Sequence, residues 1–483
     1  MTPPPRTVRH PVRIVHLGLG AFHRAHQAWY TQRANRDAEA SGTSGWGIVA
    51  FTGRSPHAAS VLAAQDAVYT LIERGPHADT AERIESLSEV ADGGDTARWR
   101  AAVSDPAVAV ITLTVTEAGY RPPVADLDAD RVALRDGGPG RTAPGRLADG
   151  LRARRDAGAG GLAVVSCDNL PDNGRVAREA VVGLAADVDP ALARWIEDEV
   201  SFVSTMVDRI TPATTDADRE AAERLTGFTD AAPVVTEPFS EWVLSGDFPA
   251  GRPEWESAGA KFVDDIEPFE RRKLWLLNAG HSLLAYLGLL RGHGTIAEAM
   301  DDHACVDALE EIWAEARIEL PFDDEQVDAT LAALRERFRN ARIEHRLAQI
   351  ASDGSQKLGP RILDPIRARL ASGRGPGRAE AATIAAWILH VLGGDQRDAA
   401  ATRLAGHLQG IRDGGPDTDG GGGLDAALTA ATLDAIAPDL AGDPAVQDAV
   451  RHQLRALRTD TTLAPAEAVT SATATPETPQ GAH

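Results

Sequence analysis

The chain has 483 residues, of which 43% are hydrophobic and 25% charged, and its formal net charge is −22. A chain of this length and composition is expected to fold as two globular domains with sizeable cores. The acidic balance argues against nucleic acid and anionic membranes as partners, because both require a basic protein surface.

Cys167 and Cys305 are the only cysteines in the sequence. Two cysteines cannot support a disulfide framework, so a reducing, cytoplasmic location is expected. His303 is close to Cys305, but no second cluster with ligand spacing accompanies them, and no metal site is predicted. The first ten residues lack the apolar segment of a secretory signal, and no apolar run is long enough to span a membrane.

The first predicted strand, residues 12–17, leads directly into a Gly-Leu-Gly-Ala-Phe turn and then a helical stretch. This order is typical of dinucleotide-binding domains. Gly18 permits the tight turn, and Gly20 lets the backbone approach a pyrophosphate, which the N-terminus of the next helix attracts. The third glycine of the usual pattern is missing. We expect Gly18, Gly20, Ala21 and Phe22 to contact the cofactor.

The second predicted strand, residues 46–51, is followed by Thr52, Gly53 and Arg54. NAD-dependent enzymes usually place an acidic residue here, which binds the ribose 2′-hydroxyl. This chain has none. Arg54 either meets a 2′-phosphate or is a solvated loop arginine, so the residues leave the choice between NAD and NADP open.

Further strands are predicted at 108–114, 161–166 and 202–210. Strands that alternate with helices predict an α/β fold whose N-terminal part is a Rossmann-type doubly wound sheet. Ligands bind at the carboxyl ends of such strands. Thr116 and Glu117 are therefore expected to contact the nicotinamide, and Asn169 a substrate oxygen. Asp208 and Arg209 are interpreted as a structural ion pair or as part of the site.

The polar, acidic segment at 213–230 is predicted to be a boundary loop. We assign residues 12–230 to a dinucleotide-binding domain and residues 231–460 to a mostly α-helical substrate and catalytic domain. A glycine-rich loop is expected at 410–423, and a disordered tail at 461–483. Helices are predicted at 267–290, 304–318, 324–339, 341–351, 360–371, 379–393, 396–410, 425–437 and 444–458.

Lysine is rare in this chain. Of its 49 Lys and Arg residues, only Lys261, Lys273 and Lys357 are lysine. Where a fixed positive charge suffices, this composition uses arginine. A remaining lysine is therefore a candidate for proton transfer, which arginine cannot perform because it stays protonated.

Lys273 lies in an apolar helical stretch that also carries Asn278 and His281. At about 100° per residue, Asn278 lies about 140° and His281 about 80° around an α-helix from Lys273, so all three fit on one broad face. Glu270 precedes Lys273 by three positions and can lie beside it. The stretch is interpreted as a catalytic helix; a core helix with an exposed lysine is the alternative.

A second polar segment, residues 353–361, contains Lys357 and Arg361 and follows Arg346. Basic groups of this kind bind substrate hydroxyls or a carboxylate. We predict Arg346 and Lys357 to be substrate-binding. The alternative is a loop between helices that carries surface charges.

Taken together, several stretches resemble the mannitol dehydrogenase family, the polyol-specific long-chain dehydrogenases and reductases. The chain departs from the family pattern at Ala279-Gly280 and after the second strand. The matching stretches extend in order over roughly residues 12–365 and are residues 18–27, 64–66, 167–169, 208–212, 237–239, 273–278 with His281, and 353–355.

The resemblance implies a zinc-independent, NAD(P)-dependent oxidoreductase with a Rossmann-type domain, a mostly helical domain and the active site between them. The roles it implies are catalytic base for Lys273, hydrogen-bond donor to the reacting oxygen for Asn169 and Asn278, proton movement for Glu270, and substrate contact for His281 and Asp208. For Lys273 to act as a base, its ordinary pKa of about 10.4 must fall, which burial would cause.

The predicted reaction transfers hydride between NAD, with NADP not excluded, and a sugar alcohol and its ketose, as in a mannitol 2-dehydrogenase. Fructuronate or tagaturonate reduction is a close alternative, because the basic residues near Lys357 suit an anion. Mannitol-1-phosphate 5-dehydrogenase activity is another alternative. A non-catalytic dinucleotide-binding protein would have little reason to retain Lys273, Asn278, His281 and Asn169. The expected partner is a small molecule, and the expected assembly a monomer or simple homo-oligomer.

Overall fold

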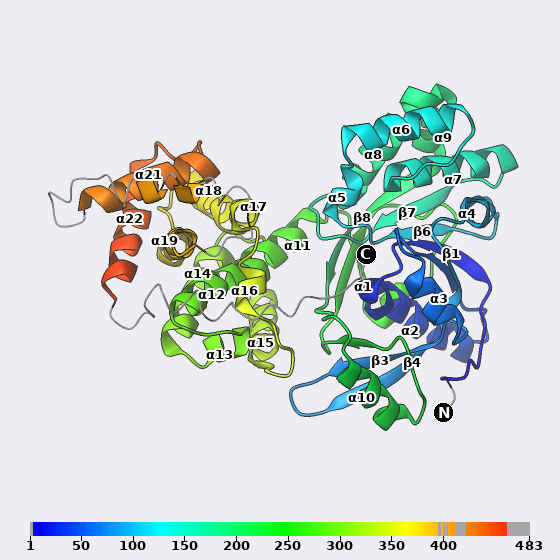
Figure 1. The fold of residues 1–483 in the computed structure, drawn as a ribbon, viewed down its shortest axis with the longest axis horizontal. Coiled ribbons are helices and arrows are strands. Elements are labelled where there is room, and N and C mark those ends of the chain that lie inside the picture. The colour runs from blue at the N-terminus through cyan, green and yellow to red at the C-terminus, as the bar shows by residue number, and fades with distance from the viewer. Residues whose placement is uncertain are drawn as a thin grey trace. The chain divides into compact units, whose positions relative to one another are not determined.

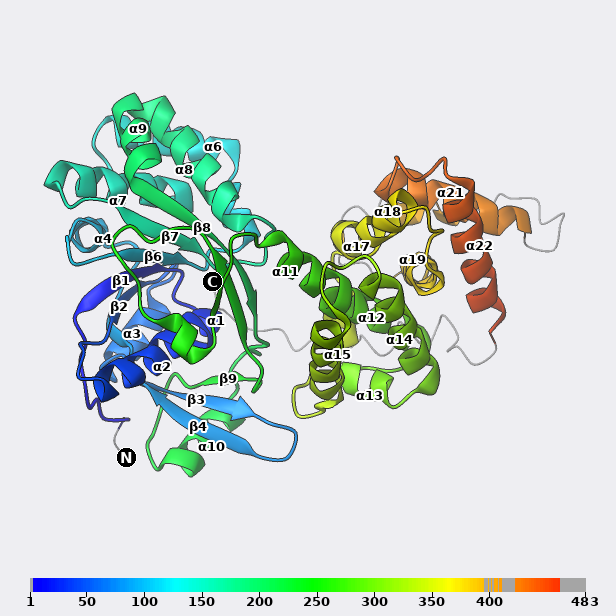
Figure 2. The same cartoon turned by 180° about the vertical axis from the view of Figure 1, so that it is seen from behind.

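The computed structural model of the chain describes residues 3–394 and 422–460, with residues 398, 401, 404–406 and 408–410 between them. The predicted tail at 461–483, most of the predicted loop at 410–423 and part of the predicted helix at 396–410 lie outside these residues. The chain divides into two compact units between Phe269 and Glu270. Figures 1 and 2 show the two units coloured along the chain.

Within the described part of the chain, the N-terminal unit is built on an eight-stranded sheet. Its strands are β1 (Val12–Leu17), β2 (Gly47–Phe51), β5 (Leu87–Ala91), β6 (Val110–Leu113), β7 (Leu162–Ser166), β8 (Val200–Asp208), β10 (Glu241–Ser245) and β11 (Lys261–Phe262). They lie in the order β11-β10-β8-β7-β6-β1-β2-β5. The run β5-β2-β1-β6-β7-β8 is parallel throughout, which is the strand order of a dinucleotide-binding sheet. The predicted Rossmann-type fold is confirmed.

Helices cover both faces of this sheet (Figure 1). Alternate strand residues enter different cores: Ile14 and Ala163 pack with Trp29 on one face, and Val15 and Val164 pack with Trp99 on the other. Strands buried on both faces have continuous apolar sequences, which is why they could be recognised in the sequence. The helices of this unit are α1 (Ala21–Ala25), α2 (Gln27–Ala40), α3 (His57–Ala63), α4 (Thr96–Val103), α5 (Glu117–Tyr120), α6 (Val124–Arg135), α7 (Ala143–Ala157), α8 (Asn173–Val188), α9 (Pro190–Glu199), α10 (Asp216–Thr226) and the 3₁₀ turn η1 (Trp255–Ala258).

The N-terminal unit extends beyond the predicted division after residue 230. A smaller sheet joins β4 (Asp79–Ile84), β3 (Tyr69–Arg74) and β9 (Val234–Thr236), and β10 pairs with β8 in the main sheet. The segment predicted as a boundary loop contains α10. Thr215 and Asp218 form a capping box at its start, so the acidic composition there reflects a helix N-terminus.

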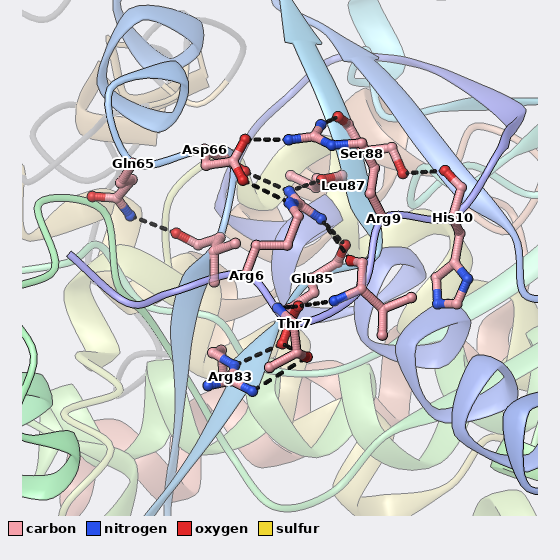
Figure 3. A network of polar contacts seen from close by, with 12 residues as sticks. Arg6, Thr7, Arg9, His10, Gln65, Asp66, Arg83, Glu85, Leu87 and Ser88 are labelled. Carbon is pink, nitrogen blue, oxygen red and sulfur yellow. Dashed lines mark hydrogen bonds and ion pairs between the residues drawn. The ribbon is translucent and has the colours of Figure 1, made fainter.

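The residues before β1 are held by a polar network (Figure 3). The Arg6 guanidinium donates to the Asp66 carboxylate at 2.9 Å and to the carbonyls of Glu85 and Leu87 at 2.7 Å each. The Thr7 hydroxyl donates to the Glu85 carboxylate at 2.8 Å. Asp66, part of one stretch that carried the family resemblance, therefore contributes to the fold.

The second unit is helical in its described residues, and its helix α12 packs against α14, α16 and α19. The predicted helix at 267–290 consists of three consecutive helical segments, α11, η2 and α12.

Among the described residues, no helix is both long and apolar enough to cross a membrane. The helices are α11 (Glu267–Arg272), the π-helical turn η2 (Lys273–Asn278), α12 (Ala279–Leu290), α13 (Ile296–Met300), α14 (His303–Arg317), α15 (Asp324–Arg339), α16 (Leu347–Ile350), α17 (Gly354–Leu358), the π-helical turn η3 (Gly359–Leu363), α18 (Asp364–Ala371), α19 (Arg378–Leu392), α21 (Gly422–Ile436) and α22 (Pro444–Thr459).

Two buried carboxyl groups meet at the start of α19. Glu315 accepts the backbone N–H groups of Ala379 at 2.9 Å and Glu380 at 3.0 Å. Glu380 accepts that of Gly377 at 2.9 Å, and its other carboxyl oxygen has no hydrogen-bond partner among the described residues. Burial raises the pKa of Glu380 to about 8 and also raises that of Glu315.

Replacing Glu380 with glutamine is expected to stabilise the protein at alkaline pH. The folded-state pKa of about 8 lies above the ordinary value of 4.5. Folding therefore favours the protonated form, and stability falls as the pH rises from about 4.5 to about 8. Glu380→Gln should remove part of this fall and raise the free energy of unfolding at about pH 9 by roughly 1 to 3 kcal/mol. Urea unfolding across this pH range measures the effect. Glu310→Gln, which removes the surface partner of Arg335, should leave the pH dependence of the free energy of unfolding unchanged. An unchanged pH dependence in Glu380→Gln would contradict the prediction.

Candidate active site

A cavity of about 1060 Å³ lies at the carboxyl ends of β1, β2 and β6. It is lined by Leu17 and Gly18 after β1, by Gly53 and Arg54 after β2, and by residues 114–116 after β6. Its volume is near the upper end of the range of small-molecule sites. Ligands of open α/β sheets bind at this edge.

Gly18 shapes the first wall of the cavity. Its φ is +111°, and an added Cβ atom would lie 2.0 Å from the Thr114 carbonyl oxygen. The N–H groups of Gly18 and Leu19 donate to the Phe51 carbonyl at 3.0 and 2.9 Å. The turn therefore requires glycine for its conformation and for close packing against β6, as the sequence pattern predicted.

Thr116 shapes the second wall in a strained conformation. Its φ is +68°, which is unusual for a β-branched residue and typical of functional sites. The Asp168 carboxylate accepts the N–H groups of Val115 at 3.0 Å and Thr116 at 2.8 Å, and the Tyr120 hydroxyl at 2.7 Å. Burial raises the pKa of Asp168. This carboxylate holds the strained loop in place.

Arginine dominates the charge of the cavity. The described residues that line it include Arg54, Arg121, Arg141 and Arg146, against one acidic residue, Asp126. The Arg146 guanidinium donates to the carbonyls of residues 52, 53 and 93 and stabilises the loop after β2. The other three side chains are exposed, with no hydrogen bond or ion pair among the described residues. In a chain of net charge −22, this gathering suits the phosphates of a dinucleotide.

The remaining residues predicted to bind the cofactor do not line this cavity. Gly20 is the extended residue before α1, Ala21 and Phe22 begin α1, and Glu117 begins α5. Sequence reasoning did not identify Arg121, Arg141 or Arg146. They follow no strand directly, and only the fold brings them to the ends of β1, β2 and β6.

In the helical unit, Lys273 lies in the π-helical turn η2, with Asn278 at the other end of the turn. In such a turn the backbone bonds join residues five apart, which is the separation of Lys273 and Asn278. The α-helical spacing used for the sequence prediction therefore does not apply here, and the two residues lie one turn apart on the same side. Trp313 donates its indole N–H to the Leu276 carbonyl at 2.9 Å. π-helical turns are frequent at functional sites.

His281 follows on α12 and is 7% exposed. Its ring stacks on Phe338 at 4.6 Å and meets His345 edge-on at 4.7 Å. Its Nε2 has no hydrogen-bond partner among the described residues. Burial first, then the charges of His345, Arg337, Arg361 and Lys273, hold the pKa of His281 well below its ordinary value. A neutral imidazole with a free buried nitrogen is suited to bind a hydroxyl group.

The two basic residues predicted to bind substrate differ in setting. Arg346 has a side chain that is 72% exposed and pairs with Glu344 at 3.6 Å. The Lys357 ammonium donates to the carbonyls of Ile350 at 3.2 Å and Ser352 at 2.5 Å, and burial lowers its pKa. Neither is among the main charges that act on His281. Arg361, which was noted in the sequence but not included among the predicted site residues, is among them.

Three other predicted site residues lie in or after different elements. Asn169 is exposed in the loop after β7, and Glu270 is half-buried in α11. Asp208 is the last residue of β8 and is 9% exposed. In the antiparallel pairing of β8 with β10, it lies opposite Glu241. The neighbouring Arg209 is buried and forms an ion pair with Glu73 at 2.6 Å.

The departure from the family pattern at Ala279-Gly280 is explained by helix packing. An added Cβ atom at Gly280 would lie 2.9 Å from a Leu309 methyl group and 3.3 Å from the Trp313 indole nitrogen. Glycine therefore lets α12 and α14 approach closely.

The ligand atoms of His293, Asp302 and Cys305 lie within 4.8 Å of one another. In the sequence, only the neighbouring pair His303 and Cys305 suggested a metal site. The Asp302 carboxylate already accepts the Arg291 guanidinium at 2.5 Å, the His293 Nε2 at 2.9 Å and the N–H of Ala304 at 2.9 Å. The guanidinium charge opposes a bound cation, so we assign no metal to this group.

The parallel sheet has the strand order of nicotinamide dinucleotide-binding domains, and the helical unit after it carries a lysine in a π-helical turn. Residues 12–257 match the mannitol dehydrogenase Rossmann domain, and residues 265–457 match the mannitol dehydrogenase C-terminal domain. The chain belongs to the mannitol dehydrogenase family, as the sequence motifs predicted.

Two relatives and one solved structure illustrate the similarity. The chain is 40% identical to D-mannonate oxidoreductase of Escherichia coli (strain K12), over 80% of this chain and 81% of that protein. It is 38% identical to mannitol 2-dehydrogenase of Cereibacter sphaeroides, over 75% and 77%. The ternary complex of Pseudomonas fluorescens mannitol 2-dehydrogenase with NAD and D-mannitol has 31% sequence identity and a TM-score of 0.77, and covers 96% of this chain and 94% of that one.

Proposed function

We propose that the protein is an NAD-dependent dehydrogenase that interconverts a secondary alcohol of an open-chain sugar derivative and the corresponding ketone. The observation that carries this proposal is the arrangement on η2 and α12: a lysine and an asparagine one turn apart, followed by a buried histidine with an unpartnered Nε2. Membership of the mannitol dehydrogenase family supports it. D-Mannitol with D-fructose, and the sugar acid D-mannonate with D-fructuronate, are the candidate substrate pairs.

In this proposal, Lys273 removes the proton of the substrate hydroxyl in oxidation and returns it as an ammonium in reduction. Arginine would be unable to do so because it stays protonated. Glu270, three residues earlier, would pass the proton to solvent. Asn278 and Asn169 would donate hydrogen bonds to the oxygen as negative charge develops, a contribution of about 3 kcal/mol per donor. His281 would hold a hydroxyl of the sugar chain, and Asp208 and Lys357 are the further substrate residues.

NAD is the proposed cofactor, and when bound it accepts hydride from the substrate carbon. The cavity residues fit a dinucleotide: Gly18 forms the tight turn after β1, and the cavity's arginines that have no ion pair among the described residues would bind the phosphates. Thr116 would bind near the nicotinamide. Gly20, Ala21, Phe22 and Glu117 remain predicted cofactor contacts.

We also propose that the enzyme acts in the reducing cytoplasm, as a monomer or simple homo-oligomer. Its two cysteines, Cys167 and Cys305, are free and buried.

A panel of substrates tests the function. We expect NADH formation from D-mannitol or D-mannonate, and NADH consumption with D-fructose or D-fructuronate, both followed by absorbance. A failure to convert any of these with NAD(H) or NADP(H) would contradict the proposal and favour a non-catalytic dinucleotide-binding protein.

Arg54 is expected to determine how well the protein binds NADP(H). Its side chain lines the cavity directly after β2, where the ribose 2′-position is normally recognised. Arg54→Asp should raise KM for NADPH about tenfold or more, because it replaces a phosphate partner with a like charge, and should change KM for NADH much less. Arg224→Asp, at an exposed position of α10, controls for the change in net charge. Equal effects on both cofactors would show that Arg54 meets a phosphate common to both.

A further inference from the structure

Arg361 occupies an unusual electrostatic position in the helical unit. It lies in η3, which packs against η2, so two π-helical turns meet and each carries a basic residue. The Arg361 guanidinium donates to the Ser282 hydroxyl at 3.1 Å, and Ser282 follows His281 directly on α12. Arg361 is therefore held beside the histidine that the proposed function assigns to substrate.

No carboxylate forms an ion pair with Arg361 among the described residues. Other arginines of this unit are paired, as Arg335 is with Glu310 at 2.5 Å. Asp353 and Asp398 act on Lys357 and Tyr286, but neither is bonded to Arg361. Burial lowers the pKa of Arg361 to about 10, which reflects the cost of a partly buried cation that has no ion pair among the described residues.

Basic groups also surround His281. Within the described residues, the main charges that act on it are basic: His345, Arg337, Arg361 and Lys273. Burial lowers the pKa of His345 to about 4, so this imidazole is neutral near pH 7, and the fixed positive charge comes from the arginines. Independently, the Nε2 of His281 has no hydrogen-bond partner among the described residues and can therefore bond a polar group of a ligand.

We propose that Arg361 binds a carboxylate of the substrate, and that the substrate is a sugar acid of the aldonate and ketouronate class rather than an uncharged polyol. A guanidinium binds a carboxylate through two parallel hydrogen bonds, and the anion would neutralise the buried charge. A polyol would leave that charge unpaired. This inference rests on the proposed function, in which the reacting hydroxyl lies at Lys273, and it adds Arg361 to the residues predicted to bind the substrate.

The wild-type enzyme provides the first test. We expect kcat/KM for D-mannonate to exceed that for D-mannitol about 10²-fold or more. By the same factor, kcat/KM for D-fructuronate should exceed that for D-fructose. In each comparison, the sugar acid carries a carboxylate where the neutral sugar carries a terminal hydroxymethyl group. A preference for the neutral substrates would overturn the inference while leaving the proposed function intact. Activity with none of the four would overturn both.

Variants provide the second test. Arg361→Gln should lower kcat/KM for D-mannonate about 10²- to 10³-fold, mainly through KM, and change that for D-mannitol only a few-fold. Arg361→Lys should recover part of the loss, because it restores the charge but not the paired hydrogen bonds. Arg451→Gln, which removes an exposed arginine of the same unit that pairs with Asp448, should leave kcat/KM for both substrates as in the wild type. Equal losses on the acid and the polyol in Arg361→Gln would show a structural role and overturn the inference.

Discussion

Replacing Lys273 with alanine is expected to lower kcat at least about 10²-fold, the lower end of the contribution of general acid–base catalysis. Lys273→Arg should be almost as damaging, because the guanidinium keeps the positive charge but cannot accept a proton. Both variants should still bind NADH, since the cofactor cavity is formed by residues of the N-terminal unit. Initial rates in both directions, together with NADH fluorescence titration, measure these effects.

Lys261→Ala is the matched control for this prediction. Lys261 has a half-exposed side chain that pairs with Glu241 at 2.8 Å, so its loss should leave kcat within about twofold of wild type, as expected for a surface ion pair. The pH profile adds a separate readout. Alcohol oxidation by the wild type should decline as the base becomes protonated at low pH, and Lys273→Ala should lose this dependence. Near-normal turnover in Lys273→Ala would refute the assignment.

Gly18→Ala is expected to destabilise the N-terminal unit and abolish cofactor binding. The added Cβ atom would lie 2.0 Å from the Thr114 carbonyl oxygen in a residue whose φ is +111°. Either the β1 turn or the end of β6 must move. The cost is roughly 2 to 4 kcal/mol, given the price of a strained conformation and of overpacking. Thermal unfolding and NADH titration measure the two consequences.

Gly20→Ala separates folding from binding at the same turn. Its added Cβ atom would lie 3.6 Å from the Gly18 carbonyl oxygen, an ordinary contact, and its backbone is extended. Stability should therefore change by less than about 1 kcal/mol. If the pyrophosphate passes over Gly20, KM for NADH should rise about tenfold or more. Normal cofactor affinity in Gly20→Ala would remove Gly20 from the binding residues, and normal stability in Gly18→Ala would contradict the steric account of the turn.

Much of the fold was predictable because strong local signals coincide with it. The buried strands β1, β2, β6 and β7 are apolar on both faces and are followed by turns or helices. By contrast, β4 was not predicted. It is only partly buried and is rich in charged residues, and its pairing with β3 is a long-range property that its composition does not reveal.

The domain division shows a similar limit. Residues 213–230 are polar, as a linker would be, but they include a capped helix. The strands after them belong to the N-terminal unit only because β9 pairs with β3 and β10 with β8. Strand pairing joins residues far apart in sequence, and polarity alone cannot predict it.

The sequence alone determined the family and the dinucleotide-binding fold, and it predicted Lys273 as the catalytic base. Each depends on local information: an apolar strand before a glycine turn, and a lysine in a chain that otherwise uses arginine. Tertiary structure decided three further matters. Lys273 and Asn278 lie in a π-helical turn, several arginines gather around one cavity, and Arg361 is among the main charges that act on His281. These properties depend on backbone hydrogen bonds and on the burial of charge, which arise only when distant segments pack together.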